Sequence, residues 1–125
     1  LHPGVLYRLG MLLTRGPKKD EGFKLLAQAA ELAQFDPALA GIAVGHARAL
    51  DTARKDREAE SAYRAALKAN PENALAYYYL AAFYYRTRSY DNAQIQINAG
   101  LRVREISEDL VEAFRALQEK LSEKG

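Results

Sequence analysis

Side chains capable of acid–base or nucleophilic chemistry are few and scattered along this sequence. His2 and His46 are its two histidines, and it has no cysteine. It contains no serine–histidine–acid set, no metal-ligand spacing and no glycine-rich phosphate loop after a strand. His46 falls at a position expected to face a helical core, where a hydrogen-bonded imidazole is more common than a metal ligand. We therefore predict no catalytic residues, no metal ion, no cofactor and no enzymatic activity.

The side chains of this sequence that are best suited to bind a partner protein are those of tyrosine and arginine. Tyr78 and Tyr85 are seven residues apart, so in a helix they project from one face, and Arg86 lies beside them. Residues of these types are frequent anchors of protein–protein contacts. The remaining aromatic residues of this stretch are expected to pack in the interior: Tyr77, Tyr79, Phe83 and Tyr84.

The segments that must position these residues repeat with a period of 34. Pro37 and Pro71 are 34 residues apart, and small or apolar residues recur at the same spacing. A fixed period of this length is typical of stacked helical hairpins, in which no single unit can bury its apolar face alone. The matched pairs are Ala43 and Tyr77, Ala47 and Ala81, Leu50 and Tyr84, Ala59 and Ala93, Tyr63 and Ile97, and Ala66 and Gly100.

Size and charge fit an ordinary globular domain. The chain has 125 residues, of which 49% are hydrophobic, and a formal charge of only +2. This charge is too small to suggest a nucleic-acid footprint, and no apolar run approaches the roughly 18 residues of a membrane span. Because the sequence starts at Leu1 without an initiator Met or a signal-like segment, we expect a fragment of a longer protein and leave its compartment open.

Apolar spacing, helix caps and breakers predict seven helices and no strand. Asp20 and Asp36 are expected to be N-caps, and the Gly16-Pro17 pair is expected to end the first helix. The predicted helices are Val5 to Thr14, Glu21 to Gln34, Ala38 to Ala53, Arg57 to Ala69, Ala74 to Arg86, Tyr90 to Arg104 and Ser107 to Ser122.

These residues resemble the tetratricopeptide repeat (TPR) family. The family pattern has a Leu-Gly-like pair, a large apolar residue, two small residues around an aromatic residue, and a closing proline. The second unit supplies His46-Ala47, Leu50, Ala59, Tyr63, Ala66 and Pro71; the third supplies Leu80-Ala81, Tyr84, Ala93, Ile97 and Gly100; the first supplies Leu9-Gly10, Leu13, Gly22, Leu26 and Ala29. Pro37 comes three residues late for the first unit, which we interpret as a second helix about one turn longer than normal.

The resemblance implies an all-α, right-handed superhelical array of about three TPR-like hairpins plus a C-terminal capping helix. The whole chain, 1–125, would form one domain, with repeats at about 3–36, 37–70 and 71–104 and the capping helix at about 107–122. In such arrays the first helix of each hairpin lines a concave surface that docks a peptide or helix of a partner protein. Carried over by register, the partner-binding residues are Tyr7, Met11, Val44, Arg48, Asp51, Thr52, Leu75, Tyr78, Ala82, Tyr85 and Arg86.

Three other functions are weighed against this one. Some TPR domains hold a peptide carboxylate with Lys, Asn and Arg, but Gly45 stands where a key Asn is expected, which disfavours that clamp. The unit could instead be a structural spacer or a self-association module of a larger protein, forming a homo-oligomer through the exposed start of the first repeat. RNA binding by a related helical repeat is disfavoured by the 34-residue period and the balanced charge. We predict a protein or peptide partner, no nucleic acid and no membrane insertion.

Overall fold

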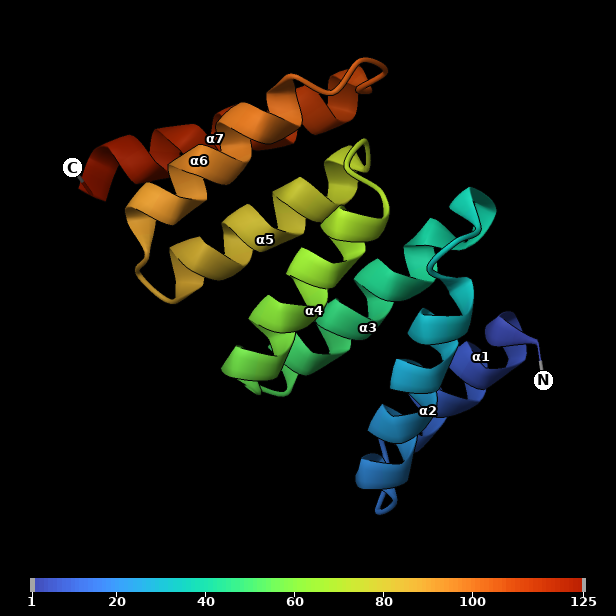
Figure 1. Ribbon diagram of the computed structural model, residues 1–125. Coiled ribbons are helices and arrows are strands. Elements are labelled where there is room, and N and C mark those ends of the chain that lie inside the picture. Colours follow the sequence, from blue (N-terminus) through green and yellow to red (C-terminus); the bar gives the residue numbers. More distant parts are fainter. Residues whose placement is uncertain (1, 125) are drawn as a thin grey trace. The chain divides into compact units, whose positions relative to one another are not determined.

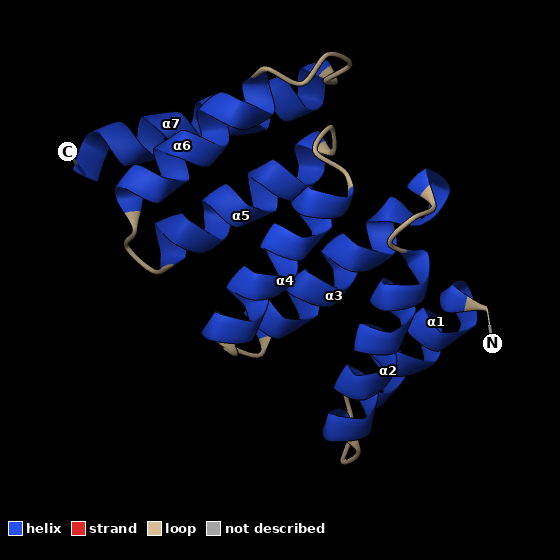
Figure 2. Ribbon diagram, viewed as in Figure 1, coloured by secondary structure: helices blue, strands red, loops and turns tan. Residues whose placement is uncertain are grey.

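The computed structural model describes residues 2–124, so Leu1 and Gly125, which the predicted domain includes, lie outside the described residues. Within that range the chain forms seven α-helices, one short 3-10 turn and no strand (Figure 1, Figure 2). The predicted all-α helical repeat is thus confirmed. None of the helices between residues 2 and 124 is both long enough and apolar enough to cross a bilayer. The contacts divide the chain into two compact units, Leu1–Asn70 and Pro71–Gly125.

The first unit consists of two helical hairpins. Its helices are α1 (Pro3–Leu13), α2 (Lys19–Ala33), α3 (Ala40–Thr52) and α4 (Asp56–Ala69), and α2 is joined to α3 through the 3-10 turn Pro37–Leu39. α1 pairs with α2 and α3 pairs with α4, while α3 also packs against both helices of the first hairpin. A core cluster shared by the two hairpins consists of Leu6, Ala29, Ala33 and Ile42, with Tyr7, Leu25 and Leu39 packed against it.

The second unit is one hairpin and a final helix. α5 (Ala74–Arg86) pairs with α6 (Tyr90–Leu101), and α7 (Glu108–Lys124) packs on both of them. Phe114 on α7 is completely buried and lies over Gly100 of α6, where an added Cβ atom would be 2.9 Å from the Phe114 Cε1 atom. The absence of a side chain at Gly100 therefore lets α7 approach α6 closely enough to bury Phe114.

The second and third hairpins keep the predicted period. α3 and α5 begin at Ala40 and Ala74, and α4 and α6 begin at Asp56 and Tyr90, each pair 34 residues apart. The small residues at the helix crossings, where the period requires close contact, are buried: Ala59, Ala66, Ala93 and Gly100. This burial confirms that side-chain size recurs in step along the paired helices.

The two helices of the first hairpin cross with their backbones close together. An added Cβ atom at Gly22 on α2 would lie 2.7 Å from the Thr14 backbone nitrogen and 2.8 Å from the Gly10 carbonyl oxygen. Gly10 and Gly22 occupy the positions of Ala47 and Ala59 in the next hairpin, where these two residues are also buried. Glycine at both positions allows the backbones of α1 and α2 to meet.

The three extra residues of the first repeat do not lengthen its second helix by a turn, so that interpretation is wrong. α2 ends at Ala33, only one position beyond the counterpart of the last residue of α4, and the rest of the insertion lies in the connection 34–39. Asp36 caps the 3-10 turn there, because its Oδ1 atom accepts a hydrogen bond from the Ala38 backbone N–H at 3.0 Å. Pro37 follows and has no N–H to donate, so α2 cannot continue through it.

Most other helix ends agree with the prediction within two residues, except that α6 ends at Leu101 instead of Arg104. The predicted N-cap Asp20 is wrong. α2 begins one residue earlier, at Lys19, and Lys18 holds the cap position without a side-chain hydrogen bond. Asp20 lies instead in the first turn of α2, where a negative charge interacts favourably with the helix dipole.

The turns inside the second and third hairpins contain a left-handed arginine each, Arg54 with φ 60° and Arg88 with φ 65°. A side chain costs about 1–2 kcal/mol in this conformation, which glycine adopts freely. We expect Arg88→Gly to raise the free energy of unfolding by about 0.5–1 kcal/mol, after the larger chain entropy of glycine is deducted. Urea unfolding followed by circular dichroism measures the change. Arg115→Gly at an exposed position in the middle of helix α7 is the control and should lower stability by about 1 kcal/mol; equal effects of the two variants would contradict the assignment.

Candidate functional site

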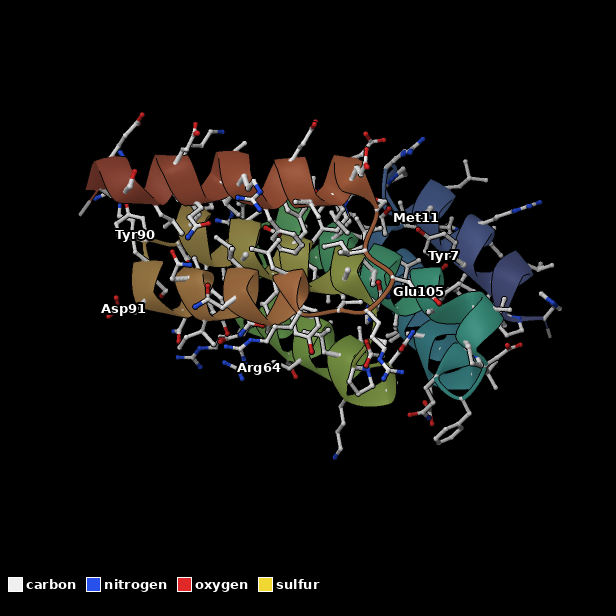
Figure 3. The ribbon with its side chains drawn as sticks, turned by 90° about the horizontal axis from the view of Figure 1, so that it is seen from above. Tyr7, Met11, Arg64, Tyr90, Asp91 and Glu105 are labelled. Atoms are coloured by element: carbon white, nitrogen blue, oxygen red, sulfur yellow. The ribbon has the colours of Figure 1, made fainter. Side chains whose placement is uncertain are left out.

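A groove of about 520 Å³ runs between α1 and α3 of the first unit. Four of the predicted partner-binding residues line it, namely Tyr7, Met11, Arg48 and Thr52. Tyr7 and Met11 lie one helical turn apart on α1 (Figure 3). The groove also contains residues that were not predicted to bind a partner: Thr14, Arg15, Lys19, Phe23, Gly45, Ala49 and Ala53.

Gly45 shapes the floor of this α1/α3 groove. The ring of Tyr7 crosses from α1 over Gly45, and an added Cβ atom at Gly45 would lie only 2.7 Å from the Tyr7 Cζ atom. A larger residue at this position would therefore displace Tyr7. Gly45 stands where the carboxylate-clamp pattern has an asparagine. In this chain the ring of Tyr7 occupies the space that an asparagine side chain would fill.

The charges along the α1/α3 groove have one sign. Arg15, Lys19 and Arg48 line it, and no acidic side chain is among the lining residues. Arg15 lies in the turn 14–18 and Lys19 starts α2. Neither was predicted to bind a partner, because this stretch was interpreted as a helix breaker and its lysines as too sparse a cluster for nucleic acid. The position of this turn could have indicated Arg15 and Lys19, because a turn that follows the first helix of a hairpin lies at the end of the surface that the helix forms.

Two predicted site residues on α3 make interior contacts. Val44 is 3% exposed and therefore offers almost no surface to a partner. Asp51 is half-buried, and its Oδ2 atom accepts a hydrogen bond from the Tyr63 hydroxyl of α4 at 3.0 Å. The carboxylate of Asp51 thus links the two helices of the second hairpin.

In the second unit, the predicted residue Tyr78 is covered in part by the final helix. Its ring lies edge-on to Phe114 of α7, with 5.6 Å between the ring centroids, and edge-on to Tyr79 at 5.5 Å. Its side chain is half-buried as a result. Tyr78 therefore helps to hold α7 on α5, whatever contact it makes with a partner.

The other predicted residues of α5 have more surface. Leu75 is 44% exposed, and Ala82, Tyr85 and Arg86 are half-buried. The ring of Tyr85 lies 5.7 Å from that of Tyr90. The guanidinium of Arg86 lies 5.4 Å from the centroid of the Phe83 ring, a cation–π contact. These contacts restrict the side chains, which lowers the entropy cost of any further contact they make.

A second, larger hollow of about 760 Å³ lies between α2 and α4, with α3 as its floor. Seven of its lining residues are alanines, so its walls consist mostly of small side chains. Phe23 and Leu50 add large apolar surface. Unlike the α1/α3 groove, it is balanced in charge, with three acidic and three basic residues: Asp20, Glu31, Glu58, Lys24, Lys55 and Arg57. The prediction considered only first helices and therefore did not include this hollow.

His46 lies on the floor of the α2/α4 hollow and is half-buried. Burial lowers the pKa of His46 from its ordinary value of 6.5, and the negative charge of Glu58 opposes this shift in part. The neutral imidazole is therefore the form that the folded chain favours. This agrees with a structural role for His46.

The lowered pKa of His46 predicts how stability depends on pH. Because the unfolded chain binds a proton at this residue more readily than the folded chain, stability is fully present above pH 6.5 and falls as the pH drops from there toward the folded pKa. We expect the Tm to fall less between about pH 7.5 and about pH 5.5 in His46→Gln than in the wild type. Thermal melts at both pH values test this, and parallel losses in the two proteins would be evidence against it.

The likenesses of this chain to known proteins are found among solved structures. No protein-family model matches the sequence. No curated protein sequence matches it. Among solved structures, the first TPR domain of Spaghetti (RPAP3), bound to the HSP90 peptide SRMEEVD, is similar with a TM-score of 0.69 and 19% sequence identity, over 96% of this chain and 95% of that chain. The chain therefore has the fold of a tetratricopeptide-repeat domain.

Proposed function

We propose that the chain is a non-enzymatic protein-interaction module that binds an extended, acidic segment of a partner protein in the α1/α3 groove. One observation carries this proposal. Arg15, Lys19 and Arg48 line the groove together with no acidic side chain, although the chain as a whole is nearly neutral. A segment with several carboxylates would match this charge, whereas a neutral or basic segment would not.

The remaining lining residues suit a peptide. Tyr7 and Met11 offer an aromatic ring and a flexible thioether for apolar side chains, and the guanidinium of Arg48 adds positive charge that attracts a carboxylate. The structurally similar TPR domain was solved with the peptide SRMEEVD, which itself contains glutamate and aspartate. That likeness supports an acidic peptide as the class of ligand.

The predicted residues of α5 extend the proposal to the second unit. Leu75, Ala82, Tyr85 and Arg86 have exposed or half-buried side chains, and we propose that they also contact a partner protein. The balanced charges of the α2/α4 hollow give no comparable preference for an acidic ligand.

Binding of the labelled peptide SRMEEVD, measured by fluorescence anisotropy, tests the proposal. We expect saturable binding that weakens as salt is added, because the charged groups are exposed. Arg48→Glu should weaken it by about tenfold or more, since a repulsive charge replaces an attractive one. A peptide with lysine at the three acidic positions should not bind.

Lys68→Glu is the matched control, because it makes the same charge change on α4, away from the α1/α3 groove. It should weaken binding by less than about twofold through the change in net charge. Equal losses for Arg48→Glu and Lys68→Glu would show that only the overall charge attracts the peptide. No binding by the wild type would reject an acidic segment as the ligand.

A further inference from the structure

The α1/α3 groove changes in character along its length. At one end the Tyr7 ring lies over Gly45, where an added Cβ atom would be 2.8 Å from the Tyr7 Cε1 atom. Met11 lines the groove one helical turn later on α1 and is half-buried. At the other end Arg15 and Lys19, which are both exposed, line the groove where the chain turns from α1 into α2. The groove therefore has an uncharged, aromatic end and a cationic end.

Two contacts show that α1 and α3 run in the same direction along this groove. Tyr7 in the first half of α1 contacts Gly45 in the first half of α3. Beyond the C-terminal ends of these helices, the Lys55 Nζ atom lies 5.3 Å from the centroid of the Phe23 ring. Arg48 follows Gly45 by three residues on α3, so its charge lies between the two ends. The positive charge of the groove is thus in its middle and beside the hairpin turns.

The carboxylates nearest to the cationic end belong to other surfaces. Asp20, which follows Lys19, lines the α2/α4 hollow. Asp51 on α3 accepts a hydrogen bond from the Tyr63 hydroxyl at 3.0 Å. Neither carboxylate is among the residues that line the α1/α3 groove. Exposed Lys18 adds a further positive charge to the turn between α1 and α2.

The length of the groove relates its two ends to a peptide sequence. Tyr7 and Arg15 are eight residues apart along α1 and the turn after it, which corresponds to about 12 Å at the helical rise per residue. An extended chain covers the same distance in about four residues. A segment that reaches both ends therefore has a large apolar side chain about four residues away from its carboxylates.

Building on the proposed function, we infer that the α1/α3 groove binds its acidic segment in a fixed order. A large apolar side chain of the partner packs on Tyr7 and Met11, and the carboxylates bind at Arg15 and Lys19. Gly45, which stands where the carboxylate-clamp pattern has an asparagine, lies at the apolar end. The carboxylate site of this chain is thus about two helical turns away from that position. Met11 and Lys19 determine specificity for different parts of the segment.

Three labelled peptides of one composition test the order by fluorescence anisotropy, without any change to the chain. They are LSSSEEE, EEESSSL and ESLSESE, each with an acetyl and an amide cap that remove the terminal charges. The first two separate the leucine from the glutamates in either chain direction, whereas carboxylates flank the leucine of ESLSESE on both sides. We expect one of the first two to bind at least about tenfold more tightly than ESLSESE.

Substitutions on both partners locate each end of the groove. Replacing the peptide leucine by serine should weaken binding by about tenfold in the wild type and by less than about twofold in Met11→Ala. Lys19→Ala should weaken both peptides and leave the effect of the leucine unchanged. Leu12→Ala is the control for Met11→Ala, because Leu12 is 65% exposed and does not line the groove. A peptide leucine whose effect depends on Lys19 and not on Met11 would overturn the inference.

The fixed order and the proposed function can be told apart when they fail. If SRMEEVD binds and the three peptides of one composition bind equally tightly, an acidic segment remains the ligand and the fixed order is overturned. If neither SRMEEVD nor any of the three peptides binds the wild type, the proposed function is rejected together with the order.

Discussion

Replacing Phe114 by alanine should lower the free energy of unfolding by about 3–5 kcal/mol. Phe114 is completely buried, beside Gly100 of α6 and Tyr78 of α5, so the substitution removes a large contact of α7 and leaves a cavity. Because the Gly100 backbone has no side chain, nothing beside it can fill the space. Urea unfolding monitored by far-UV circular dichroism gives the change in free energy.

Phe35→Ala is the matched control for this experiment. Phe35 is 88% exposed at the end of α2, so the same substitution should change stability by no more than about 0.5 kcal/mol. The near-UV signal should also weaken in Phe114→Ala, because Tyr78 loses one of its two aromatic neighbours. If both variants unfold at the same urea concentration as the wild type, α7 does not pack as described.

Enlarging the small residues at the helix crossings should have the second largest effect. Ala59 and Ala93 are fully buried and occupy equivalent positions 34 residues apart. Leucine at either position should cost about 1–3 kcal/mol, because the extra atoms push paired helices apart. Ala116→Leu on the exposed side of α7 is the control and should be nearly neutral. A Tm for Ala59→Leu or Ala93→Leu that is no lower than that of the wild type would contradict the packing.

The periodic part of the fold was predictable because it depends on side-chain size at fixed spacing. Small residues such as Ala59, Ala93 and Gly100 recur at this fixed spacing in the sequence. A larger side chain at any of these positions would separate two helices. The fate of the three inserted residues before α3 was not predictable in this way. Asp36 can cap a helix and Pro37 can interrupt one, so the sequence allows more than one end for α2. Only the structure shows a 3-10 turn, Pro37–Leu39, that is capped by Asp36 and stands in place of a longer helix.

The candidate site was predicted in part. Tyr7, Met11, Arg48 and Thr52 lie together because residues of neighbouring first helices face one groove. Register alone did not show that Val44 is buried, since this depends on what packs against the helix face. A search restricted to first helices could not supply Arg15 and Lys19, because Arg15 lies in the turn 14–18 and Lys19 is the first residue of α2. Together with Arg48 they create the charge on which the proposed function rests.

Binding of an acidic peptide in the α1/α3 groove can be mapped by NMR chemical shifts. The peptide SRMEEVD is titrated into the ¹⁵N-labelled chain, and amide shifts are followed for every residue. We expect the largest shifts at Gly45, Arg48 and Lys19, with small shifts at Ala62 and Ala65 in the α2/α4 hollow. Shifts concentrated in the α2/α4 hollow, or spread evenly over the surface of the chain, would contradict binding in the α1/α3 groove.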